Sequence, residues 1–340
     1  MSGFRFVVLL AAAAGSVRAQ SGANAASLVE EVARFANEAG SWRVEGTLVT
    51  RGSDGRDEAG VPFHIAYQLP RYARLETGGG DTAVLRICEG TAQWTYYPGL
   101  HGFVRVLLPQ IGACAFPLNA WPPLSATLPS PRVAGTDTVT IDGHPRSCQV
   151  VRGELGWPGR DPEVKDTVTL CIDPQSKLIL RYQSQHSAPG PPSTKTYTFS
   201  SVERDPQLAS NLFEFQAPEG SRALATIDWL SPIPGVSPGV YRVSDAVSAP
   251  ILTSVSPPAW PAEAALVSGG NTVALHVEIG KDGIPHDVQV SRSLGPGLDE
   301  EAVKCVKRWR FEPAMNASGQ VAVAATIFVH FMDPVRSLHK

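Results

Sequence analysis

Few residues of this chain are placed to do chemistry, and the clearest pattern is Gly235-Val236-Ser237-Pro238-Gly239. The spacing matches G-x-S-x-G, in which a serine nucleophile stands on a sharp turn between a strand and a helix. Here Pro238 follows the serine inside a proline-rich stretch, so that local structure is not expected. A serine hydrolase acting through Ser237 is therefore the weakest of the functional hypotheses.

The other reactive side chains form no catalytic or metal-binding pattern. The eight histidines are scattered, and none belongs to an HExxH motif or to a Cys/His pair at ligand spacing. His276 and His330 are expected at strand surfaces. Gly78-Gly79-Gly80 lacks the lysine and the helix of a phosphate-binding loop. We therefore expect no enzyme, no metal site and no cofactor.

Five cysteines are the remaining candidates for covalent chemistry. Cys148 and Cys171 fall in neighbouring predicted strands, so we favour a disulfide between them, as an oxidising compartment permits. Cys88 and Cys114 would then pair across the loop that separates them. Cys305 is left over on an apolar helix stripe and is expected to be an inert core thiol. The sequence does not fix this connectivity.

Composition and the N-terminus indicate an exported protein. The 340 residues carry a formal net charge of −3, and no basic block points to nucleic acid as a partner. Residues 1–19 have the pattern of a secretory signal, with an apolar run after Arg5 and a small-x-small cleavage site before Gln20. No later segment is long and apolar enough for a membrane-spanning helix.

The strongest periodic pattern lies between Pro257 and Phe331. Alternating apolar residues predict a strand over 272–279, and Asp282-Gly283 predicts a hairpin turn into a second strand. After Gly297 an apolar stripe from Leu298 to Trp309 predicts a helix, and a third alternating strand follows. The predicted order is β-β-α-β, with a short helix before it at 261–266.

This stretch resembles the TonB C-terminal domain family. The matching pieces are PPAWPAEA, VEIGKDGIPHDVQVSRSLGPGLDEEAVKCVKRWRFEPA and the final alternating strand. The resemblance implies a domain at 250–335 that binds an outer-membrane receptor or another envelope protein by β-strand addition, and it implies a periplasmic location. The edge strand that would pair with the partner carries Val321, Val323, Ala325, Ile327 and Val329. Their side chains are expected in the core, and only the backbone edge would bind.

Residues 20–222 predict a second domain, in which one amphipathic helix at 25–40 precedes many evenly spaced strands. A loop is expected over 98–131. The leading helix, the CIDPQSKLILRYQ hairpin and the closing FEFQAPEG resemble the LolA/LolB lipoprotein-carrier fold. The predicted fold class is thus α+β, with a curved antiparallel half-barrel, a proline-rich linker at 223–249 and the small C-terminal domain.

The half-barrel resemblance implies an apolar groove for a lipid or a lipoprotein. Aromatic and aliphatic residues that could line it, or simply fill the core, are Phe63, Tyr67, Trp94, Tyr96, Phe103, Leu107, Phe116 and Trp121. We therefore expect a non-enzymatic envelope protein with two binding modules. The alternative is a membrane-anchored TonB-type energy transducer for outer-membrane transport, which would retain residues 4–14 as an anchor.

Overall fold

The computed structural model describes residues 24–36, 38–52, 54–68, 72–108, 128, 130–154, 167–186, 193–244, 246–261, 271–316 and 318–331. The predicted signal at 1–19 and the predicted short helix at 261–266 therefore lie almost wholly outside the described residues. Within the described ranges, no helix is long and apolar enough to cross a membrane.

The chain divides into two compact units. The first lies within Met1–Pro62, Leu118–Gly156 and Asp161–Pro206, and the second within Phe63–Pro117, Trp157–Arg160 and Gln207–Lys340. This division differs from the predicted boundaries at 222 and 249, because strands from the predicted first domain pack with the C-terminal strands in the second unit.

The first unit is a six-stranded antiparallel sheet with one helix. The helix covers residues 24–36. The strands run in the sheet order β1 (Ser41–Arg51), β11 (Ser193–Arg204), β10 (Ile179–His186), β9 (Thr167–Ile172), β8 (His144–Glu154) and β7 (Arg132–Ile141). The alternating burial of β1 and β9 follows the pleat, which turns successive side chains to opposite faces.

The helix of the first unit is amphipathic and its apolar stripe is buried. Leu28, Val29 and Val32 are each at most 5 % exposed. At its C-terminal end the Ala36 carbonyl accepts a hydrogen bond from the Trp42 indole at 3.4 Å. On its solvent-facing side, the Glu31 carboxylate forms an ion pair with the Lys177 ammonium group, with 2.6 Å between Oε2 and Nζ. These contacts hold the helix against the start of β1 and the turn between β9 and β10.

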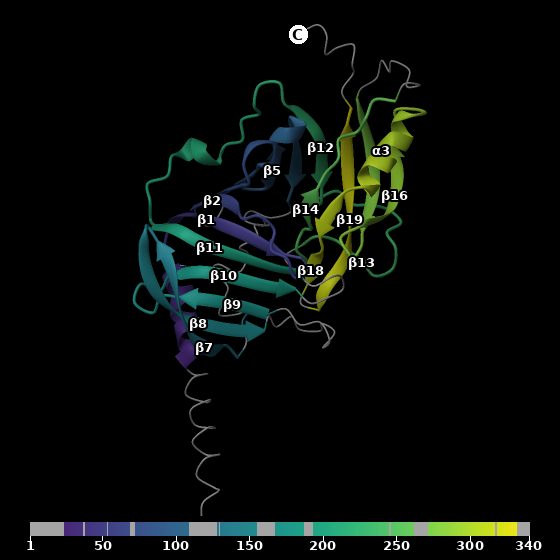
Figure 1. Ribbon diagram of the computed structural model, residues 1–340. Coiled ribbons are helices and arrows are strands. Elements are labelled where there is room, and N and C mark those ends of the chain that lie inside the picture. The colour runs from purple at the N-terminus through teal and green to yellow at the C-terminus, as the bar shows by residue number, and fades with distance from the viewer. Residues whose placement is uncertain are drawn as a thin grey trace, which may run out of the picture. The chain divides into compact units, whose positions relative to one another are not determined.

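The second unit contains a longer sheet. Its order is β16 (Pro285–Arg292), β15 (Thr272–Ile279), β19 (Gly319–His330), β12 (Arg222–Asp228), β6 (Gly102–Leu107), β5 (Ala92–Tyr97), β4 (Val84–Glu89), β3 (Tyr72–Thr77) and β2 (Val61–Gln68). Neighbours are antiparallel except β12 and β6, which are parallel. Figure 1 shows β12 in green between β5 and β19.

Short elements complete the second unit. These are the helix α3 (Leu298–Lys307), the 3-10 turns η1 (Gly80–Thr82), η2 (Pro98–Leu100) and η3 (Ser210–Phe213), and the strands β13 (Val240–Tyr241), β14 (Ile251–Ser254), β17 (Arg310–Glu312) and β18 (Ala314–Asn316). The strands predicted at 272–279 and 284–292, the helix after Gly297 and the last strand thus all occur in the predicted order, with β17 and β18 added.

Two expectations about this region were wrong. The predicted loop at 98–131 contains β6, and the predicted linker at 223–249 contains β12 and β13. One hydrophobic core includes Val104 of β6, Ile227 of β12, Val247 and the strands and helix of the C-terminal region. The described part of segment 223–249 therefore contributes to the C-terminal core at its two ends, through residues 224–229 and 243–249, while residues 230–242 between them are mostly exposed.

Candidate functional site

Strand β19 was predicted to be the free edge, and the structure contradicts this. On one side Thr272–Ile279 of β15 pairs with Val323–His330. On the other side β12 pairs with Thr326–Val329, β13 with Ala322 and Val323, and β18 with the start of the strand. The backbone groups that a partner strand would need are thus already paired within the chain.

The side chains of the predicted edge are core residues, as expected. Val321, Val323, Ala325, Ile327 and Val329 are between 0 % and 5 % exposed. They share one face of β19 and pack in the same hydrophobic core as α3. This part of the prediction used the two-residue alternation of apolar side chains, which can be read from the local sequence alone.

Strand β16 is the open side of the sheet. Among the described residues it pairs with β15 alone, with Val288 opposite Val277 and Val290 opposite Leu275. From Gln289 to Arg292 every side chain is exposed. An unpaired row of N–H and C=O groups at such an edge is the backbone requirement for adding another strand.

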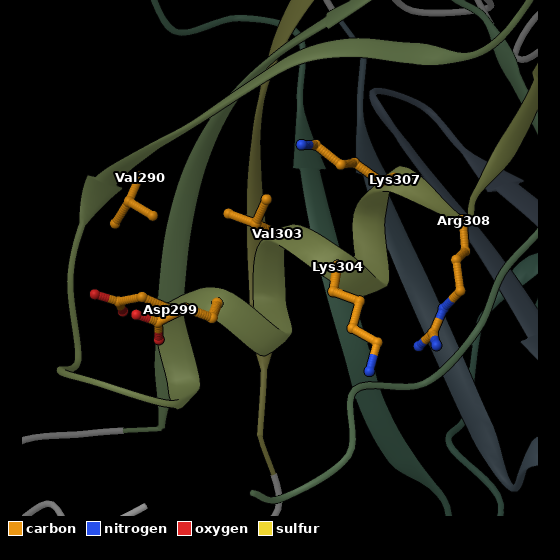
Figure 2. A pocket seen from close by; sticks show the side chains of 7 residues that line it. Val290, Asp299, Val303, Lys304, Lys307 and Arg308 are labelled. Carbon is orange, nitrogen blue, oxygen red and sulfur yellow. The ribbon is translucent and has the colours of Figure 1, made fainter.

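An open groove of about 700 Å³ lies between this edge strand and α3. Figure 2 shows Val290 on the strand beside α3, and Val303, Lys304 and Lys307 spaced along the helix. Val290 is 40 % exposed, although it lies on the sheet face that α3 covers. The residues lining the groove are Val290, Asp299, Glu300, Val303, Lys304, Lys307 and Arg308.

Charge in the groove is separated along the helix. Asp299 and Glu300 lie in its first turn, and Lys304 and Lys307 in its last turn. This order favours the helix, because acids stabilise the N-terminus and bases the C-terminus. Glu300 also accepts a hydrogen bond from the Gly297 backbone at 2.6 Å. The groove therefore has an acidic end, an apolar middle and a basic end.

The basic end keeps most of its charge available. Glu301 lies 3.8 Å from Lys304 and 3.7 Å from Arg308, long separations for an ion pair. Lys304 is 68 % exposed at its side chain, and no ion pair of Lys307 is found among the described residues. Glu301 is only 14 % exposed at its side chain and holds both cations loosely, so the exposed Lys304 and Lys307 can still reach an external carboxylate.

The turn before β16 is fixed by close contacts with β17. Gly283 has φ +73°, and a Cβ there would lie 1.8 Å from the Phe311 carbonyl oxygen. The Gly283 carbonyl in turn accepts a hydrogen bond from the Phe311 N–H at 2.9 Å. Only glycine fits this approach, which explains why the Asp-Gly turn and the WRF segment occur together.

The end of α3 is fixed by the segment that opens the module. The Ser256 carbonyl accepts hydrogen bonds from the Trp309 indole and the Cys305 thiol, both at 3.0 Å. Cys305 is free and buried, as predicted, and burial raises the pKa of its thiol. The helix that forms one wall of the groove is thus held firmly at its C-terminal end, which favours binding without a large rearrangement.

His330 is the titratable group that the fold perturbs most clearly near β19. Its Nδ1 lies 2.9 Å from the Thr272 hydroxyl and its Nε2 lies 3.2 Å from the Thr226 hydroxyl. Burial, and then the positive charge of Arg292, lower the pKa of His330. This histidine, expected at a strand surface, joins β12, β19 and β15 across the closed side of the sheet.

The aromatic residues predicted to line one apolar groove are divided between two faces. The strand register puts Phe63 and Tyr67 on the face that also carries Gln93, and Trp94, Tyr96, Phe103 and Leu107 on the other. Phe63 is fully buried. Phe116 and Trp121 lie outside the described residues. The predicted set is therefore not one groove.

The second of these faces carries an aromatic cluster. Phe215 stacks on Trp94 with ring centres 4.8 Å apart and lies 5.2 Å from Phe103. Arg105 lies over the Trp94 ring at 5.0 Å, and the Trp94 indole donates to Glu89 at 2.6 Å. These side chains are only partly buried, so the cluster presents apolar surface.

The remaining chemical candidates have structural explanations. Ser237 lies in turns between β12 and β13, with no helix after it, and its backbone N–H donates to Glu278 at 2.7 Å. The described residues contain no group of three or more ligands that could hold a metal ion. The environment of a nucleophile elbow is thus missing at Ser237.

The disulfide predicted between Cys148 and Cys171 is confirmed, with Cα atoms 5.4 Å apart on β8 and β9. Cys88 is also disulfide-bonded. Its predicted partner Cys114 lies outside the described residues, so that pairing stays a prediction.

Comparison with known proteins identifies the C-terminal region. Residues 256–332 match the family model described as the Gram-negative bacterial TonB protein C-terminal region. The chain is 45 % identical over 58 residues to Protein tonB2 of Pseudomonas aeruginosa. That match covers 17 % of this chain and 22 % of the relative, so the chain spans about a fifth of the length of this curated relative. The predicted resemblance to the TonB C-terminal domain is confirmed.

Comparison with solved structures also found similar chains, at low sequence identity. The lipoprotein LppX of Mycobacterium tuberculosis covers 55 % of this chain at 15 % identity and a TM-score of 0.34, with 97 % of LppX matched. The LolA superfamily protein NE2245 of Nitrosomonas europaea covers 56 % at 11 % identity and a TM-score of 0.31, with 97 % matched. The Pseudomonas aeruginosa MucA/MucB complex covers 90 % of this chain at 13 % identity and a TM-score of 0.34, with 93 % matched.

Proposed function

We propose that this chain is an exported, non-enzymatic envelope protein whose C-terminal sheet binds a partner protein by β-strand addition at β16. The observation that carries the proposal is the pairing of the sheet. β19 has strands on both sides, whereas β16 pairs with β15 alone among the described residues. Strand addition obtains affinity from the backbone and specificity from alternate side chains.

The groove beside β16 supports this role. An added strand would direct every second side chain toward α3, where Val290 and Val303 offer an apolar contact. The charged residues at both ends would select among partner segments. By its resemblance to the TonB family, the partner is an outer-membrane receptor or another envelope protein, and the compartment is the periplasm.

The proposal is tested with short extended peptides taken from receptor segments that face the periplasm. Calorimetry measures their binding to the intact protein, and each peptide is also made with single backbone N-methyl groups. Strand addition predicts loss of binding for methyl groups at every second residue and retention at the residues between them. Binding that ignores the position of the methyl group, or no binding by any receptor segment, would refute the proposal.

A second binding role is proposed for the aromatic cluster of the second unit. The aromatic cluster of Trp94, Phe103 and Phe215 offers partly exposed apolar surface that a lipid or a lipidated protein could cover. A fatty-acid analogue carrying a nitroxide quencher tests it. Quenching of tryptophan fluorescence that is lost in Trp94→Leu supports the role, and equal quenching in both proteins contradicts it.

A further inference from the structure

We infer that the Cys148–Cys171 disulfide is a site of reversible reduction by a dithiol, and that an ion pair between Asp137 and Arg181 controls access to it. The inference concerns the first unit and does not rest on the proposed function, which concerns the second. It follows from the place of the disulfide on the sheet, which is the polar face and not the core.

The strand pattern puts both cysteines on the polar face of the sheet in the first unit. On β9 the fully buried Leu170 lies on one face, and Cys171 shares the opposite face with Thr169. On β8, Val150 is paired with Cys171, so Cys148, two residues earlier, lies on the same face. Both cysteines are nevertheless only 1 % exposed. Other side chains on this face therefore cover them.

Two charged side chains from the flanking strands form this cover. Asp137 of β7 is opposite Cys148, and Arg181 of β10 is opposite Cys171. Asp137 and Arg181 are joined to each other by a hydrogen-bonded ion pair. Because all four residues share one face, this ion pair crosses the two strands that carry the disulfide. The Arg181 guanidinium also holds the pKa of the Asp137 carboxyl below its usual range.

The cover can open without unfolding of the sheet. The side chain of Asp137 is 46 % exposed and that of Arg181 is 31 % exposed, so water reaches both ends of the pair. Ion pairs with this exposure are weak, and rotation of two side chains is enough to break one. Opening the pair uncovers the sulfur atoms while the backbone pairing of the strands stays in place.

A second ion pair near the disulfide is held more firmly. Arg146, two residues before Cys148, lies 3.6 Å from Asp173, two residues after Cys171. The Asp173 side chain is only 12 % exposed, and it accepts a hydrogen bond from the Ser176 hydroxyl at 2.7 Å. The pair between Asp137 and Arg181 is therefore the part of the surroundings that moves most easily.

Reduction takes two exchange steps once the cover is open. A thiolate of the reductant attacks Sγ of Cys148, the S–S bond breaks, and its electron pair leaves on Sγ of Cys171. The second thiol of the reductant loses its proton to water and attacks the reductant's own sulfur in the mixed disulfide. This step releases Cys148 as a thiolate and the reductant as a disulfide. Arg181 lies opposite the leaving sulfur, and a cation beside a cysteine stabilises its thiolate.

The consequence of reduction is confined to the first unit. The covalent link between β8 and β9 is lost, while their backbone pairing from Gln149 to Glu154 remains. The unfolded chain then regains the freedom that the link had removed, so the unit becomes less stable. The ion pair thus determines how readily a dithiol lowers the stability of this unit.

The inference is tested by the rate at which dithiothreitol reduces this bridge in the full chain. Samples are alkylated at intervals, and peptide mass spectrometry follows Cys148 and Cys171 apart from the other cysteines. We expect Asp137→Asn to speed reduction about threefold or more, because it opens the cover and removes a carboxylate that repels the incoming thiolate. Arg181→Gln also opens the cover but removes the cation beside the leaving sulfur, so its gain should be smaller.

The first unit offers a matched control for these variants. Glu203→Gln breaks the exposed pair between Arg43 and Glu203, which joins β1 and β11 and does not flank the disulfide. We expect this variant to be reduced at the wild-type rate. High salt, which weakens exposed ion pairs, should speed reduction of the wild type and leave Asp137→Asn unchanged.

Urea well below the unfolding transition separates local opening from unfolding. Reduction through the moving ion pair exposes little surface, so we expect its rate to be almost independent of urea in the wild type. A rate that rises steeply with urea, an increase below about threefold in Asp137→Asn, or an equal increase in Glu203→Gln overturns the inference. A gain in Arg181→Gln as large as that in Asp137→Asn overturns the assignment of Cys171 as the leaving sulfur. Peptide binding by the second unit is measured separately and tests the proposed function whatever these rates are.

Discussion

At the scale of single residues, His330 makes the stability of the sheet around β12, β19 and β15 depend on pH. Its ring lies between the hydroxyls of Thr226 and Thr272, and burial together with Arg292 lowers its pKa from 6.5. The unfolded chain therefore binds a proton more readily than the folded chain does. Stability attributable to this histidine is present above the unfolded pKa and is lost as the pH falls below it.

We predict that the free energy of unfolding falls between about pH 7.5 and about pH 5.5, and that His330→Gln reduces this fall. Glutamine keeps a neutral hydrogen-bonding group between the two threonines and cannot take up the proton. Urea unfolding of both proteins at the two pH values is the measurement. An identical pH dependence in the variant would show that His330 does not carry the effect.

The Cys148–Cys171 bridge is a second residue-scale contribution, and it belongs to the first unit. It closes a sequence separation of 23 residues between β8 and β9. We predict that Cys148→Ser/Cys171→Ser lowers the free energy of unfolding of this unit by about 3 kcal/mol, chiefly by freeing the unfolded chain. Calorimetry in the absence of reductant measures it, and a loss below about 1 kcal/mol would contradict the prediction.

At the scale of elements, β12 decides which edge of the C-terminal sheet is open. It lies between β6 and β19, and Leu224, Ala225 and Ile227 are at most 1 % exposed. Its sequence, RALATID, follows a Gly-Ser pair and precedes several prolines. The local pattern therefore favours a linker, and only distant pairing partners make this segment a strand.

We predict that Ile227→Ala costs about 2 to 5 kcal/mol, as for a large core side chain cut to alanine. Val290→Ala on β16 is the matched substitution at the open edge and should change stability by less than about 1 kcal/mol. Chemical denaturation monitored by tryptophan fluorescence gives both values. Equal costs at the two sites would mean that β12 is not an integral strand.

Sequence alone predicts what depends on local periodicity. The strands over 272–279 and 284–292, the helix after Gly297 and the buried face of β19 follow from alternation, the Asp-Gly turn and the apolar stripe. The open edge was assigned wrongly, because pairing depends on residues far apart in the chain. The pair between Thr226 and Phe328 leaves no local signal in either segment.

The groove residues were visible in the sequence without being recognised as a site. Glu300, Lys304 and Lys307 lie outside the apolar stripe of the helix, and Val290 alternates with Val288 along the strand, so neither pattern marks a site. Their approach depends on α3 lying beside an edge strand. The sequence feature that does indicate the groove is the separation of acids from bases along the one helix stripe that also contains Val303.

At the scale of the whole molecule, the chain combines a TonB-like C-terminal region with strands that close one of its two edges. Strands β2 to β6 and β12 belong to the same compact unit as that region. The module therefore differs from one that presents β19 to a receptor. Under the proposed function, the partner binds instead at β16 and in the groove beside α3.

Amide hydrogen exchange of the intact protein, with and without a saturating receptor peptide, tests this claim most directly. Measured residue by residue by NMR, it reports each strand separately. We predict that alternate amides of β16 (Pro285–Arg292) gain protection on binding while β12 and β19 are unchanged. Protection gained along β19 together with protection lost in β12 would contradict it, since the partner would then have displaced the chain's own strand.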